Sequence, residues 1–139
     1  MEIANIKRQV VETINRAKRR AAERRTRVDE AAKAFEVFLS RSAVPVFRQV
    51  ANVLRTEGYP FNVFTPGGSV RLMSERASDD YIELALDTTG DEPMVMGHTK
   101  RGRGRRVIES ERPVGDPATL GEEDVLAFVV KELEPFVER

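Results

Sequence analysis

The chain has 139 residues, with 23 basic and 23 acidic side chains, which suits one domain with or without an appendage. It contains no cysteine, which excludes disulfides, thiol nucleophiles, iron–sulfur clusters and cysteine-ligated zinc. The first residues lack a signal pattern, and no run approaches the ~18 apolar residues of a membrane span. We therefore expect a cytoplasmic protein that does not enter a membrane.

The charges are unevenly distributed along the chain. Residues 1–28 hold nine Lys or Arg against three Glu, whereas residues 109–139 hold three basic against nine acidic residues. Such asymmetry suits a polyanionic partner, but it also allows two ends of one fold, or two subunits, to attract each other. The second interpretation is the simpler one.

The first forty residues predict one long helix. No proline occurs before Pro45 and no glycine before Gly58, and the segment is rich in helix formers. Small and apolar residues recur at heptad spacing and form one stripe, interrupted by Lys7 and Arg24. The stripe residues that we expect at an oligomer interface are Ile3, Val10, Ile14, Ala17, Ala21 and Val28.

An unbroken helix from about residue 2 to residue 41 would be roughly 60 Å long. A compact chain of this length has a radius of gyration of only about 14 Å, so the helix should overhang its own body. A second copy of the same helix is the simplest cover, which predicts a homo-oligomer and most simply a two-fold dimer. We assign residues 1–42 to oligomerisation and residues 43–139 to an α+β domain. The alternatives are a helix that breaks at Thr26-x-x-Asp29 and folds back, or a basic N-terminal end that is frayed.

A second helix should follow, with Ser42 as its cap, Pro45 in its first turn and Gly58 at its end. After Gly58 the apolar period changes to two, which predicts strands. The five predicted strands are 60–65, 70–73, 81–87, 94–99 and 105–112. Short connections between them indicate an antiparallel meander.

A loop is expected from Pro113 to Ala118, followed by a helix over about 121–137 that begins with a capping box of Thr119 and Glu122. The residues that this helix should bury are Leu126, Val129, Val130, Leu133 and Val137. The predicted fold class is α+β, with a long N-terminal helix, a second helix, a five-stranded antiparallel meander and a C-terminal helix packed on one face of the sheet.

Candidate catalytic and metal-binding residues are sparse. His98 is the only histidine; it could assist Glu83 across the sheet, but a half-exposed strand residue is the simpler interpretation. The acids around Gly90 do not follow the spacing of a calcium loop and are typical of a turn. We expect no catalytic residue, no metal site and no cofactor.

The stretch 99-TKRGRGRRVIE-109 places five cations in a predicted hairpin tip. A basic ribbon of this kind can contact phosphates, and the basic helix supports such a role. The candidate nucleic-acid-binding residues are Lys100, Arg101, Arg103, Arg105, Arg106, Arg19 and Arg20. The alternatives are pairing with the chain's own acids, such as Glu109 and Glu111, or with an acidic protein partner. No aromatic residue lies in the tip, which argues against stacking on single strands.

The preferred hypothesis is a non-enzymatic interaction or scaffolding protein that self-associates through its N-terminal helix. The first alternative is a nucleic-acid-binding protein that uses the basic hairpin and helix. The second is a small-ligand domain with a pocket lined by Phe61, Val63, Met94 and Met96.

Overall fold

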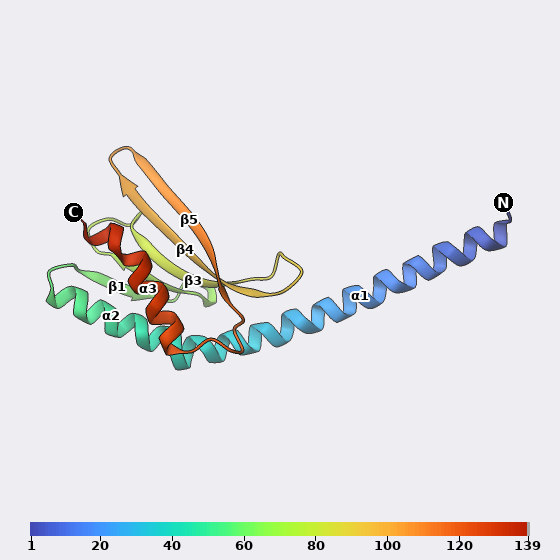
Figure 1. Cartoon of the computed structure of the whole chain (residues 1–139), viewed down its shortest axis with the longest axis horizontal. Coiled ribbons are helices and arrows are strands. Elements are labelled where there is room, and N and C mark those ends of the chain that lie inside the picture. The colour runs from blue at the N-terminus through green and yellow to red at the C-terminus, as the bar shows by residue number, and fades with distance from the viewer. Residues whose placement is uncertain (139) are drawn as a thin grey trace.

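The computed structural model describes residues 1–138 and has the predicted α+β architecture (Figure 1). The elements are α1 (Ile3–Phe38), a π-helical turn (Leu39–Ala43), α2 (Val44–Thr56), β1 (Phe61–Phe64), a 3-10 turn (Pro66–Gly68), β2 (Val70–Ser74), β3 (Tyr81–Asp87), β4 (Met94–Arg103), β5 (Arg106–Gly115) and α3 (Glu122–Val137). The strands lie in sequence order and each neighbouring pair is antiparallel. The predicted meander is confirmed.

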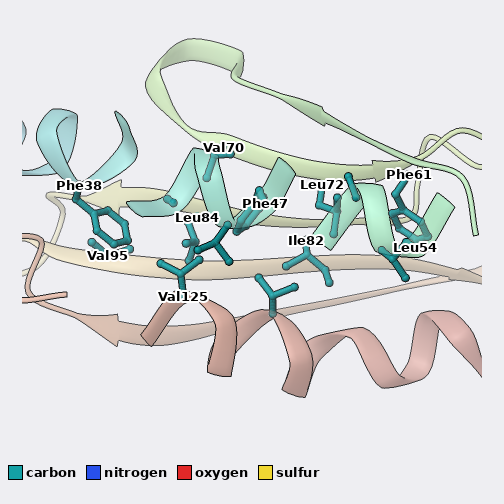
Figure 2. Packing of buried hydrophobic residues seen from close by; sticks show 14 of the residues in the cluster. Phe38, Phe47, Leu54, Phe61, Val70, Leu72, Ile82, Leu84, Val95 and Val125 are labelled. Carbon is teal, nitrogen blue, oxygen red and sulfur yellow. The ribbon is translucent and has the colours of Figure 1, made fainter. Parts of the chain in front are cut away.

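One face of the sheet carries the core. The register places Leu72 opposite Ile82, and both side chains are fully buried. Helix α2 packs over β1 and β2 on this face, and α3 packs over β3 and β4. Figure 2 shows Val125 of α3 pointing toward Leu84, within the same cluster as Phe47 of α2. A sheet covered on one face in this way buries one set of alternating side chains and leaves the other set on an open face.

Helices α1 and α2 form one continuous helical segment, so the predicted cap at Ser42 is wrong. Pro45 lacks an N–H group, and its ring crowds the preceding turn. The π-helical turn before it widens the helix: the Val44 N–H donates to the Leu39 carbonyl, five residues back. The break considered at Thr26 is also absent: α1 runs unbroken from Ile3 to Phe38, and the Thr26 hydroxyl donates to the Ala22 carbonyl inside it.

The β4–β5 hairpin is longer than the sequence predicted. Its strands run to Arg103 and from Arg106, so only Gly104 and Arg105 form the turn, and Gly104 has a φ of +61°. The loop expected at Pro113 is wrong, because β5 continues to Gly115. The register shifts by one residue beside Pro113, and such a bulge tolerates a residue without an N–H in an edge strand.

Helix α3 is rotated from the predicted orientation. Its sheet-facing residues are Val125, Val129, Glu132 and Phe136. The predicted core residues Leu126 and Val130 are instead 47% and 59% exposed. The prediction was wrong because a charged residue, Glu132, lies on the buried face and interrupts its apolar spacing. The Arg112 Nε lies 2.9 Å from the Glu132 Oε1, and this ion pair is not aligned as a hydrogen bond.

The cap of α3 is Gly121 and not Thr119. The Gly121 N–H donates to the Asp124 Oδ2 at 2.9 Å, so the carboxylate that closes the first turn lies two residues later than the predicted Glu122.

Candidate functional site

The N-terminal part of α1 projects from the body into solvent (Figure 1). We call residues 3–23 the projecting half; at 1.5 Å per residue it is about 30 Å long. Every residue from 1 to 27 except Asn5 is exposed. Its large apolar residues keep 44% to 83% of their surface in solvent: Ile3, Ile6, Val10, Val11 and Ile14. These side chains form an exposed apolar surface on a helix with no cover from its own chain.

The predicted interface residues divide between two environments. Ile3, Val10, Ile14, Ala17 and Ala21 all lie exposed on the projecting half. The sixth predicted residue, Val28, is half-buried and lies where α1 reaches the body. The prediction missed Ile6 and Val11, which flank the heptad positions and could have been found as apolar neighbours one turn away.

Residues 24–38, the packed half of α1, continue the same stripe onto the body. The Arg24 Nη2 donates to the carbonyls of Thr88, Thr89 and Gly90 at 3.3 to 3.4 Å. Phe35 and Phe38 then enter the core, with 5% and 3% exposure. The helix is therefore anchored at its C-terminal half and free at its N-terminal half.

An apolar groove of about 450 Å³ lies between α2 and α3. Its walls are two stripes with i, i+4, i+7 spacing, each from one helix. The α2 wall is Val46, Val50 and Val53; the α3 wall is Leu126, Val130 and Leu133. Val53 is 63% exposed, and the rotation of α3 that places Leu126 and Val130 outside the core is what creates the groove. Sequence reasoning missed it because it placed both of those residues in the core.

The groove and the projecting helix differ in charge. Glu122 and Glu123 line one end of the groove, and the first turn of α3 is entirely acidic. Residues 16–27 of α1, the basic belt, hold seven Lys or Arg against Glu23. In the part of the chain that the structure describes, no ion pair neutralises this belt.

The basic hairpin tip is only partly neutralised. Lys100 lies 3.6 Å from an Asp79 carboxylate oxygen and 3.9 Å from one of Glu109, so pairing with the chain's own acids is observed for this lysine. Among residues 1–138, no ion pair forms at the four arginines Arg101, Arg103, Arg105 and Arg106. Arg101 and Arg103 line a hollow of about 430 Å³ between the tip and the end of α3.

The two candidate phosphate-binding segments lie at opposite ends of β4. Arg24 in the basic belt contacts the turn before β4, while the arginine-rich tip is formed by the last residues of β4, the turn and the first residue of β5. A ten-residue strand is about 30 Å long. The hairpin and the helix, including Arg19 and Arg20, therefore do not form one compact basic site within a single chain.

The open face of the sheet carries an ion pair and a ring cluster. The Arg71 guanidinium lies 2.6 Å from the Glu83 Oε2 and 4.1 Å from the centre of the Tyr81 ring, against which His98 packs edge-on. His98 lies opposite Glu83 in the register, which is the position from which it could assist Glu83 as an acid or base. The Glu83 carboxylate, however, accepts its hydrogen bond from Arg71, and no hydrogen bond joins His98 to it among the described residues. This arrangement stabilises the sheet and does not form a proton-transfer pair.

The residues of the predicted ligand pocket do not gather in one place. Phe61 is buried on the helix-covered face, where its ring meets Phe136 edge-on. Met94 and Met96 flank the buried Val95 on β4, so they lie on the open face. The pocket that was predicted from these residues is therefore not formed.

In the described chain, no group of three histidine or acidic side chains is placed to hold a metal ion, and no helix has the length and apolar character needed to cross a membrane. Comparison with family models, with curated proteins and with solved structures gives no match for this chain. The exposed helix, the apolar groove and the basic hairpin tip are the three surfaces that suggest a function.

Proposed function

We propose that this protein is a non-enzymatic interaction protein that self-associates through its N-terminal helix α1. The observation that carries the proposal is the apolar stripe of the projecting half, where residues as large as Ile3 and Val10 are 83% and 52% exposed. Contiguous apolar surface on a projecting element is typical of an interaction site. The association would leave the compact body free to present its open sheet face to another molecule.

The length of the exposed stripe argues against a merely frayed terminus. Large apolar residues recur from Ile3 to Ile14, with small Ala17 and Ala21 continuing the same line. Isolated helices shorter than about 12 to 15 residues are marginal in water, and amphipathic helices in proteins gain most of their stability by packing the apolar face. Association with a second copy would supply that packing.

The proposal is tested by measuring the solution mass of the wild type and of a Val10→Asp/Ile14→Asp variant by light scattering over a range of concentrations. Both side chains are about half exposed, so the substitutions should leave the body folded. We expect the wild type to be an oligomer. The variant should have a dissociation constant at least about a hundredfold higher, because two carboxylates would replace two apolar groups that become buried in the interface.

The matched control is Gln9→Asp/Asn15→Asp, which adds the same two charges to exposed helix positions outside the stripe. It should associate nearly as well as the wild type. A wild type that stays monomeric at high concentration would refute the proposal.

Polyanion binding through the hairpin is a second candidate, favoured by the four tip arginines that lack ion pairs in the described chain. Phosphate contacts release counterions, so the affinity for duplex nucleic acid should fall steeply with salt. An Arg103→Ala/Arg105→Ala/Arg106→Ala variant should bind more weakly and with a shallower salt dependence of about one unit per lost contact. The comparison variant is Arg19→Ala/Arg20→Ala, which tests the basic belt separately. Undetectable binding at low salt would exclude this role.

A further inference from the structure

We infer that the apolar groove between α2 and α3 receives the projecting half of α1 from a second copy of this chain. The inference rests on the proposed self-association and specifies its contact surface. It differs from the simplest form of that proposal, in which two α1 helices pair with each other as a coiled coil.

Shape supports the groove as the acceptor. The exposed stripe from Ile3 to Ile14 spans about 16 Å of helix, and the groove wall from Glu122 to Leu133 spans about the same length. The walls present apolar residues at i, i+4 and i+7, and an amphipathic helix laid in such a groove offers the same spacing. A third helix packed there would cover the exposed side chains of Val53, Leu126 and Val130 together with those of α1.

Charge disfavours a parallel coiled-coil pairing of two α1 helices. A parallel pairing of two α1 helices in register would bring the two basic belts side by side, and Lys7 of each copy would lie in the shared seam. In the groove, the start of the basic belt at Arg16 would instead approach the acidic end that contains Glu122 and Glu123, because this end of α3 lies beside the start of α2. Complementary charge of this kind favours one register and orientation over others.

The occupant must come from another molecule. The continuous helical segment that joins α1 to α2 carries the projecting half away from the groove of its own chain (Figure 1). A rigid helix cannot reverse direction without a break, and the structure has no break between Ile3 and Phe38. The C-terminal anchor at Arg24 and Phe35 further fixes its direction.

A reciprocal exchange would close into a two-fold dimer. If two α1–α2 segments lie antiparallel with their symmetry axis near Asp29, residues 3–14 of one copy lie beside residues 44–55 of the other, which is the α2 wall of the groove. The same arrangement places the two basic belts on opposite sides of the axis, so their repulsion is reduced. Each copy then both donates a helix and accepts one.

Cross-linking tests this contact directly, because the chain has no cysteine of its own. We would introduce Val10→Cys together with Val130→Cys, both at exposed positions, and treat the full-length protein with a short bis-maleimide. Peptide mass spectrometry of the linked dimer should find residue 10 of one chain joined to residue 130 of the other. A matched Val10→Cys/Val107→Cys variant, with the second cysteine at the exposed hairpin, should give no such mixed link.

A second measurement uses the groove alone. Val53→Lys/Val130→Lys places cations at two exposed groove positions and should weaken dimerisation by at least about tenfold, while the far-ultraviolet circular dichroism stays that of the folded wild type. A groove variant that dimerises like the wild type, or links that join only residue 10 to residue 10, would overturn the inference and leave self-association through α1 standing. A monomeric wild type would overturn both.

Discussion

The two halves of α1 carry one sequence pattern in two environments. In the packed half, the stripe residues Phe35 and Phe38 are almost fully buried, and their ring centres lie 5.9 Å apart. In the projecting half, the equivalent positions Val10 and Ile14 keep about half of their surface in solvent. The heptad spacing is the same in both halves, but only one half has a sheet and helices beside it.

The difference shows that an amphipathic pattern specifies a face and not the partner of that face. The boundary lies at Arg24, whose guanidinium bonds three carbonyls of the β3–β4 turn. Beyond this residue toward the N-terminus, burial must come from outside the chain. The contrast between the halves can be tested by making equivalent changes in each.

The largest expected effect is from removal of a ring in the packed half. Phe35→Ala would leave a cavity in the core and should lower the free energy of unfolding by about 3–5 kcal/mol. Ile6→Ala, which removes an exposed side chain from the projecting half, should change the same quantity by less than about 0.5 kcal/mol. Urea denaturation in the Val10→Asp/Ile14→Asp background separates these effects from association, and equal losses would contradict the division of α1 into two halves.

Glycine substitutions should give an intermediate effect. Ala31→Gly in the packed half should lower the free energy of unfolding by about 1 kcal/mol, because helix formation by glycine costs more backbone entropy. Ala17→Gly carries the same intrinsic cost, but the exposed projecting half can fray without unfolding the body. Amide hydrogen exchange should therefore show local loss of protection around Ala17 with an unchanged global unfolding midpoint. A matching drop in the global midpoint would show that the two halves unfold together.

The smallest expected effect concerns the turn that Arg24 contacts. The Asp87 Oδ1 accepts hydrogen bonds from the Thr89 hydroxyl at 2.6 Å and the Thr89 N–H at 2.9 Å. These bonds hold the pKa of Asp87 below its ordinary value of 3.8, the hydroxyl contributing most. Because the folded-state pKa is lowered, the stabilisation is present above about pH 3.8 and is lost as the pH falls through the folded-state pKa.

The Thr89 amide resonance should report this transition in an NMR titration, and the signal of the Arg24 side chain should follow it. Asp87→Asn should abolish the pH dependence. A Thr89 amide that titrates unchanged in the variant would show that another group controls the turn.

Much of the fold could be predicted because its signals are local. The absence of glycine before Gly58 indicated a long helical segment, and the alternation in 81-YIELALD-87 indicated a strand with one buried face. Short polar connections then required antiparallel neighbours. The boundary errors at Ser42 and Pro113 arose where a π-helical turn and a bulge accommodated a residue that normally interrupts such elements.

The groove could not be predicted in the same way. Helix α3 has two adjacent apolar stripes, one through Val125 and Val129 and one through Leu126 and Val130. Either stripe could have faced the sheet by spacing alone. The close approach of the Phe128 ring to Gly97, where an added Cβ would lie 2.2 Å from the ring, depends on the tertiary packing that selected the first stripe.

By itself, the sequence determined the order of the elements, the antiparallel meander and a helix with an apolar line along its length, because period and turn chemistry act over a few residues. Only the tertiary structure decided at which residue of α1 the body ceases to cover the apolar line, and which stripe of α3 faces solvent. Those outcomes depend on which surfaces come together across the fold, and local spacing carries no information about that contact.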